Sequence, residues 1–209
     1  MIKFVYFDVG GVVVEDFSGS DKWEKMKKVM GVRKEFDKEF DSLYDKYELE
    51  ELCLTRPVDS LIPIFSKKFG FKFPENFSLQ KYFIDHFDRN KSIWLVIYQI
   101  RKKCKVGLLT NMYVDMFQIM KKRGLFPPLI WDAIIDSSIV GIQKPDPAIF
   151  KLSEKKCGFA HKEIVFVENN QKNIEAARKF GWNTFLYDPK VPKKSSKKLL
   201  EYFREEMLK

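Results

Sequence analysis

The chain begins with a short apolar run, Lys3 to Val9, that is rich in β-branched and aromatic residues and stops at two glycines. Such a run is typical of a buried β-strand that leads into a loop. From residue 16 to residue 91 the apolar side chains instead recur every three or four positions, which is the spacing of amphipathic helices. The pattern therefore predicts a first strand followed by an all-helical insertion.

Beyond residue 91 the pattern alternates between the two periodicities. It predicts helices over 93–102, 114–123, 146–156 and 173–180, and strands over 105–109, 133–137, 164–167 and 184–187. Asp146 and Pro147 form a helix start, because aspartate caps the first turn and proline fits its first position. A last helix is expected after a lysine-rich stretch, with an apolar stripe of Leu199, Leu200, Phe203 and Met207. Strands that alternate with helices predict an α/β fold with a parallel sheet covered on both faces.

The composition excludes several classes of protein. With 209 residues, 45% of them hydrophobic, the chain can bury a core and is not a disordered sequence. No apolar stretch approaches about 18 residues, and Lys3 and Asp8 interrupt the apolar N-terminus, so we expect a cytoplasmic protein without a membrane span or signal peptide. Cys53, Cys104 and Cys157 lie far apart without metal-ligand spacing, so we expect buried thiols.

The net charge of +9 raises the question of nucleic-acid binding. Residues 15–91 include 15 basic and 16 acidic residues and the rest of the chain 23 and 13, so the excess lies outside the insertion. Only 7 of the 38 basic residues are arginines, the residue type that contacts bases and phosphates through paired hydrogen bonds. We therefore expect no specific nucleic-acid partner.

Polar residues directly follow three of the predicted strands. Asp8 ends the first strand, Thr110 and Asn111 follow the second, and Glu168 follows the strand predicted over 164–167. Parallel sheets bind ligands at the carboxyl ends of their strands, so we expect these side chains to meet there, together with Lys144 from a loop. A carboxylate can attack phosphorus, a hydroxyl and a lysine can hold phosphate oxygens, and oxygen ligands can hold Mg²⁺. The set suits phosphoryl chemistry.

Four sequence blocks carry a resemblance to a known family. The blocks FDVGGVVV (7–14), GLLTN (107–111), GIQKPDPAIF (141–150) and FVENNQKNIEAARKFG (166–181) resemble, in order and spacing, the four motifs of the haloacid dehalogenase superfamily. The resemblance implies a Rossmann-like core in three layers, formed by residues 1–15 and 92–209, with an α-helical cap formed by residues 16–91. It also implies a hydrolase for a small phosphorylated metabolite, and we expect a monomer or homodimer.

The resemblance implies a role for each site residue. Asp8 would be the nucleophile that forms an aspartyl-phosphate, Thr110 would bind the phosphoryl oxygens, and Lys144 would neutralise the nucleophile and the phosphate. Mg²⁺ would be held by Asp8, the backbone carbonyl of Gly10, Glu168 and Asn169. Substrate would be bound by Gly10, Gly11, Thr110, Asn111 and Lys144.

Two positions depart from the family pattern. Gly10 stands where the family's phosphatases usually have an aspartate that protonates the leaving oxygen and then activates water. Asn169 replaces the second acid of the fourth motif, and an amide oxygen ligates Mg²⁺ without adding negative charge. We therefore expect weakened activity and weakened metal affinity.

Three functions stay open on the sequence. A Mg²⁺-dependent phosphatase is favoured because the nucleophile, the hydroxyl, the lysine and Glu168 are all present. A metal-free 2-haloacid dehalogenase fits less well, since the first motif of those enzymes has the form Asp-x-Tyr and they lack an acid like Glu168. A catalytically silent binding or scaffold protein of the same fold is the third. The cap would select the substrate, and no spacing singles out its candidate residues Tyr44, Tyr47, Arg56 and Asp59.

Overall fold

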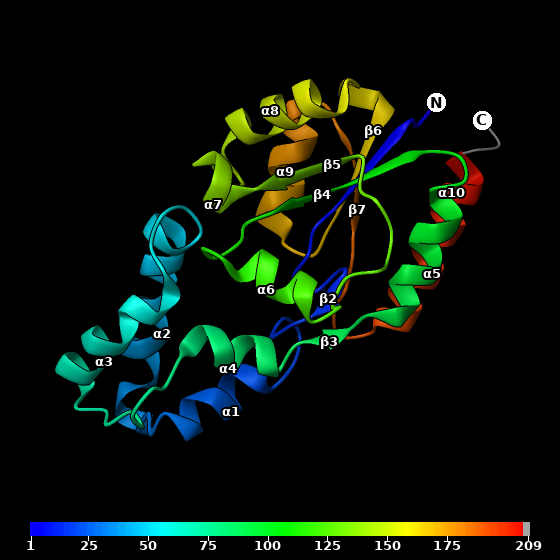
Figure 1. Ribbon diagram of the computed structural model, residues 1–209. Coiled ribbons are helices and arrows are strands. Elements are labelled where there is room, and N and C mark those ends of the chain that lie inside the picture. The colour runs from blue at the N-terminus through cyan, green and yellow to red at the C-terminus, as the bar shows by residue number, and fades with distance from the viewer. Residues whose placement is uncertain (207–209) are drawn as a thin grey trace.

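Five parallel strands form the centre of the molecule (Figure 1). In the computed structural model, which describes residues 1–206, they run in the order β5-β4-β1-β6-β7. Their bounds are β1 Phe4–Phe7, β4 Lys105–Thr110, β5 Ala133–Asp136, β6 Ile164–Glu168 and β7 Asn183–Leu186. Phe7 pairs with Leu108 on one side and with Val167 on the other. The predicted parallel sheet is confirmed.

The first strand is shorter than predicted because the chain turns after Phe7. The backbone N–H of Asp8 still donates to the carbonyl oxygen of Val167 at 2.9 Å. The carbonyl oxygen of Val9, in contrast, accepts from the N–H of Val14 at 2.9 Å, within the same loop. This turn ends the strand pairing and leaves Asp8 at the carboxyl end of the central strand.

Helices cover both faces of the sheet, which gives the predicted three layers (Figure 1). One face carries α5 Lys91–Ile100 and α10 Pro192–Glu206, and the other carries α8 Pro147–Cys157 and α9 Gln171–Phe180. The shorter helices are α6 Met116–Lys122, α7 Ser137–Val140 and the turn His161–Glu163.

Side-chain alternation along β1 explains this layering. Val5 and Phe7 belong to the apolar cluster that includes α5 and α10, whereas Phe4 and Tyr6 belong to the cluster with α8 and α9. In the predicted C-terminal stripe, Leu199 and Phe203 are buried and Leu200 is half-buried, and Met207 lies outside the described residues.

The long segment between β2 Val14–Glu15 and β3 Asp88–Arg89 consists of helices and turns. The helices are α1 Lys22–Val29, α2 Asp37–Tyr47, α3 Leu61–Phe69 and α4 Leu79–Asp85, joined by helical turns at Lys34–Phe36, Glu48–Leu52 and Val58–Ser60. We call this segment the inserted helices. It lies beyond the carboxyl ends of the sheet strands (Figure 1), and the antiparallel pair β2–β3 holds its two ends together.

The apolar interior of the inserted helices is continuous with one face of the sheet. Phe40 and Phe65 are fully buried with ring centroids 4.6 Å apart, and they belong to the same apolar cluster as Val5 and Phe7. The domain boundaries at 15/16 and 91/92 stay a prediction.

The cysteines are free thiols. Cys53 and Cys104 are buried as predicted, and Cys157 is half-buried. Within residues 1–206, no helix has the length and apolar character that a membrane crossing requires.

Candidate active site

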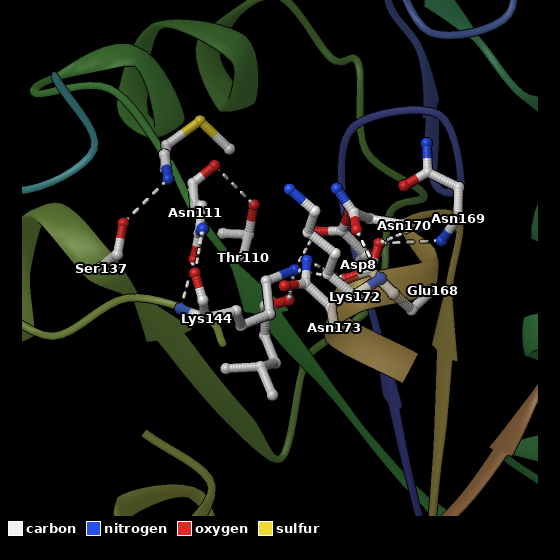
Figure 2. A network of polar contacts seen from close by, with 12 residues as sticks. Asp8, Thr110, Asn111, Ser137, Lys144, Glu168, Asn169, Asn170, Lys172 and Asn173 are labelled. Carbon is white, nitrogen blue, oxygen red and sulfur yellow. Dashed lines mark hydrogen bonds and ion pairs between the residues drawn. The ribbon is translucent and has the colours of Figure 1, made fainter. Parts of the chain in front are cut away.

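Asp8 lies where the connections of the sheet change direction. β1 is in the middle, with β4 on one side and β6 on the other, so the carboxyl ends of three neighbouring strands carry Asp8, Thr110 and Glu168. Such a switch point leaves a crevice in which open α/β sheets bind their ligands. Figure 2 shows these residues gathered with Lys144, so the structure brings together the four side chains that the sequence predicted to meet.

A buried lysine joins the two carboxylates. The Nζ of Lys144 donates to Asp8 Oδ1 at 2.9 Å, to Glu168 Oε2 at 2.7 Å and to the carbonyl oxygen of Leu109 at 3.2 Å. Lys144 is 3% exposed and Glu168 is fully buried, so water screens these charges little. Two carboxylates share one ammonium group, which leaves one negative charge uncompensated at the end of β1.

This arrangement raises the pKa values of both Asp8 and Lys144. Burial, and next the neighbouring Glu168 carboxylate, raise the pKa of Asp8 to about 7, although Lys144 acts in the opposite direction. Burial tends to lower the pKa of Lys144, but the two carboxylates outweigh burial and raise it above its ordinary value. Lys144 therefore stays charged, and Asp8 titrates near neutral pH.

The raised pKa of Asp8 predicts that the free energy of unfolding falls as pH rises. Between roughly pH 4 and pH 7 the folded chain holds a proton on Asp8 that the unfolded chain has lost, so deprotonation costs the folded state stability. At pH 8 the Asp8→Asn variant should be more stable than the wild type by about 1–3 kcal/mol, and at pH 4 the two should be equal. Urea titrations at both pH values measure this difference.

The control for this prediction is Asp115→Asn, at an exposed position before α6 where the positive φ of 64° suits asparagine. Its unfolding free energy should follow the wild type at both pH values. Parallel pH curves for Asp8→Asn and the wild type would contradict the assigned shift.

Glu168 is held by four hydrogen bonds. Its Oε1 accepts from the backbone N–H groups of Asn169 at 2.8 Å and Asn170 at 2.9 Å. Its Oε2 accepts from Lys144 and from Asn173 Nδ2 at 3.0 Å. Asn170 also caps α9, because its side chain accepts a hydrogen bond from the backbone N–H of Lys172. The fixed carboxylate thus anchors the loop that follows β6.

Asn111 holds the backbone of Lys144 rather than extending freely into the crevice. Its Oδ1 accepts from the N–H of Lys144 at 2.8 Å, and its Nδ2 donates to the carbonyl oxygen of Lys144 at 2.9 Å (Figure 2). Both ends of the amide are therefore used to position the lysine. Asn111 as a substrate-binding residue stays a prediction.

Two glycines let the loop after β1 pass close to other segments. Gly11 has φ of 71°, and a Cβ there would overlap the side-chain amide of Asn169 and lie 2.9 Å from Ser18 Cβ. A Cβ at Gly10 would overlap Oδ2 of Asp16. Glycine at position 11 thus satisfies both the backbone conformation and the packing of this loop, whereas at position 10 a side chain would meet only the Asp16 carboxylate.

A cavity of about 410 Å³ lies between this edge of the sheet and the inserted helices. Gly10, Thr110 and Asn111 line it from the sheet. The aromatic residues that line it are Phe17, Trp23, Tyr44, Phe83, Phe87 and Tyr113. Thr110 is 1% exposed, and its hydroxyl donates to the carbonyl oxygen of Asn111 at 3.3 Å.

Of the four candidate substrate residues in the inserted segment, Tyr44 lines this cavity and the other three have local partners. Arg56 forms an ion pair with Glu51 and stacks over the ring of Tyr47 at 4.9 Å. Asp59 Oδ1 accepts from the backbone N–H of Gln80 at 2.9 Å.

Sequence reasoning missed a polar chain across the cavity wall. The hydroxyl groups of Tyr44 and Tyr113 lie 2.6 Å apart, and Tyr113 donates to Oε1 of Glu48. Burial raises the pKa of Glu48, although the hydrogen bond from Tyr113 opposes the shift. Glu48 lies in the helical turn Glu48–Leu52, which contains two further glutamates. No signal in the sequence distinguishes it from them.

Comparison with known proteins decides the family. The family model described as haloacid dehalogenase-like hydrolase matches residues 2–181, which include all four sequence blocks. The chain is a haloacid dehalogenase-like hydrolase.

Structures of haloacid dehalogenase family members share this fold. A family enzyme from Bacteroides thetaiotaomicron, solved with magnesium and inorganic phosphate, superposes with a TM-score of 0.67 at 19% identity, over 90% of this chain and 94% of that one. The L-2-haloacid dehalogenase of Xanthobacter autotrophicus superposes with a TM-score of 0.64 at 20% identity, over 90% and 78%. These likenesses confirm the Rossmann-like fold and leave the reaction open.

Among curated relatives, the mouse acyl-CoA dehydrogenase family member 10 is 29% identical over 109 residues, which is 51% of this chain and 10% of that protein. The chain matches between a tenth and about a third of the length of such relatives.

Proposed function

We propose that this hydrolase is a Mg²⁺-dependent phosphatase that acts on a small phosphorylated metabolite through an aspartyl-phosphate on Asp8. The observation that carries the proposal is the buried ion triad of Asp8, Lys144 and Glu168 at the switch point of the sheet. A nucleophilic carboxylate beside a buried ammonium group suits attack on a phosphoryl group, whose negative charge the ammonium stabilises.

The proposed reaction has two displacements at phosphorus. Lys144 holds one carboxylate oxygen of Asp8, so we assign the attack to the other oxygen. That oxygen forms a bond to phosphorus while the bond from phosphorus to the substrate's ester oxygen breaks. Water then attacks the same phosphorus, the bond to Asp8 breaks, and inorganic phosphate leaves. We assign to Thr110, which lines the cavity, the donation of a hydrogen bond to a phosphoryl oxygen.

The donor set fits Mg²⁺ in type and charge. Two carboxylates, the side-chain amide of Asn169 and the carbonyl of Gly10 are the hard oxygen ligands that Mg²⁺ prefers. The triad carries one uncompensated negative charge that a cation would balance. Glu168 already accepts four hydrogen bonds, so we propose that it acts on the metal through water. When bound, the ion would neutralise phosphoryl oxygens.

The alternative reactions differ in what they need from this site. A 2-haloacid dehalogenase would displace halide with Asp8 and need no metal, and the buried Glu168 is better explained by a metal-assisted reaction. The cavity of about 410 Å³ suits a small organic phosphate. A screen that measures inorganic phosphate and free halide in parallel, with Mg²⁺ or with a chelator, distinguishes the two reactions from a silent protein.

Metal affinity should respond to the charge at position 169. Asn169→Asp adds a carboxylate to the donor set and should lower the Mg²⁺ concentration for half-maximal activity roughly tenfold, whereas Glu168→Gln should raise it. Asn170→Asp is the matched control, because it adds the same charge one residue later, where aspartate can replace asparagine as the cap of α9. Activity that a chelator does not diminish would contradict the metal requirement.

A further inference from the structure

A second carboxylate fills the space that a side chain at position 10 would occupy. Asp16 directly follows β2, and its Oδ2 overlaps the position that a Cβ on Gly10 would take, with its Cγ 3.4 Å from that position. Asp16 and Gly10 line the same cavity, together with Thr110. A carboxylate oxygen of Asp16 thus occupies the place where a side chain of residue 10 would begin.

The backbone fixes Asp16 in this position. Its Oδ1 accepts from the N–H of Ser18 at 2.8 Å, which leaves Oδ2 directed to Gly10. The pairing of Glu15 with Asp88 sets the course of the chain immediately before Asp16. Asp16 forms no ion pair among residues 1–206, so its second oxygen is not taken up by a surface lysine or arginine.

We propose that Asp16 is the general acid and base of the reaction, in place of the missing side chain at position 10. This assignment rests on the proposed phosphatase function. In the first step the Asp16 carboxyl gives its proton to the ester oxygen as the bond from that oxygen to phosphorus breaks, so an alcohol leaves and Asp16 becomes a carboxylate. In the second step the carboxylate takes a proton from the attacking water, Asp8 is released from phosphorus, and Asp16 is protonated again.

Two esters of similar size separate the two steps. The leaving nitrophenolate of 4-nitrophenyl phosphate needs no proton, whereas the leaving group of phenyl phosphate is more basic and gains from one. Asp16→Asn should slow the pre-steady-state release of phenol by roughly 10²- to 10⁴-fold and the release of nitrophenolate much less. Steady-state turnover of both esters should fall, because the water step loses its base.

The carboxylate can also be moved between the two positions. Gly10 has no positive φ, so an aspartate there meets no backbone strain once Asp16 is shortened. Asp16→Ala combined with Gly10→Asp should recover at least tenfold of the steady-state rate that Asp16→Ala alone loses. Asp45→Asn is the matched control, since Asp45 lines the same cavity without contact to Gly10, and its ratio of phenol to nitrophenolate release should equal that of the wild type.

The outcomes separate this assignment from the phosphatase proposal. If the wild type releases phosphate but Asp16→Asn keeps the wild-type rates and the wild-type ester ratio, the role of Asp16 is overturned and the phosphatase stands. If the wild type releases no phosphate from either ester, both are overturned. A folded Asp16→Ala protein that Gly10→Asp does not rescue also overturns the assignment, and thermal melting of each variant establishes that it is folded.

Discussion

Replacing Asp8 by asparagine should lower the turnover of phosphate esters by roughly 10⁴-fold or more, because an amide does not attack phosphorus. The side chain keeps its size, and the buried repulsion between Asp8 and Glu168 disappears, so the variant should fold and melt no lower than the wild type at pH 8. Release of inorganic phosphate from 4-nitrophenyl phosphate under saturating Mg²⁺ measures the loss.

Asp115→Asn makes the same chemical change outside the cavity and should retain full activity. If Asp8→Asn keeps more than a few per cent of the wild-type rate, the covalent step does not pass through Asp8. A wild type that releases halide from 2-haloacids but no phosphate would instead assign the same aspartate to the dehalogenase reaction.

Replacing Lys144 by methionine should lower the free energy of unfolding by about 3–5 kcal/mol near neutral pH, because two buried carboxylates would then lose their common cation. Asn111 would keep the backbone of residue 144 in place, since its bonds go to main-chain atoms. At acid pH Asp8, whose pKa is raised, holds a proton, so the destabilisation should be smaller. Urea titrations at pH 5 and pH 8 measure this dependence.

Lys151→Met on the exposed face of α8 is the matched control, and it should change stability by less than about 0.5 kcal/mol. A Lys144→Met protein as stable as the wild type at pH 8 would show that the triad does not carry the charges assigned to it. The Asn169→Asp variant tests metal binding at the same site, and the Asp16→Asn variant tests proton transfer to the leaving group there.

Local patterns were sufficient for the sheet and its helices. Strands such as β4 and β6 are continuous apolar runs that are buried on both faces, so their composition identifies them without knowledge of their partners. The pair β2–β3 escaped detection because each strand has only two residues, and their pairing joins positions more than 70 residues apart. Helix starts were readable where a cap is local, as at Asp146.

For the site, too, local sequence identified the residues, and the fold was needed to show their contacts. Asp8, Thr110 and Glu168 were found because each lies at the carboxyl end of an apolar run, and parallel strands bring their carboxyl ends together. Lys144 was found through its motif, but the sequence does not show that its ammonium group lies between two buried acids. Asn111 was expected to contact substrate, and only the fold reveals that its amide is bonded at both ends to the backbone of Lys144.

The sequence by itself determined the α/β order, the helical insertion, the place of Asp8 after the first apolar run and the absence of a side chain at Gly10, because each depends on neighbouring residues or on a motif. Only the tertiary structure decided which groups share a charge environment and which fill the same space. The raised pKa of Asp8 depends first on burial and next on Glu168, which lies 160 residues away in the chain. The placement of Asp16 over Gly10 depends on the turn after β1 and on the pairing of β2 with β3. Electrostatic and steric interactions act over ångströms in space, so no spacing along the chain could have revealed either.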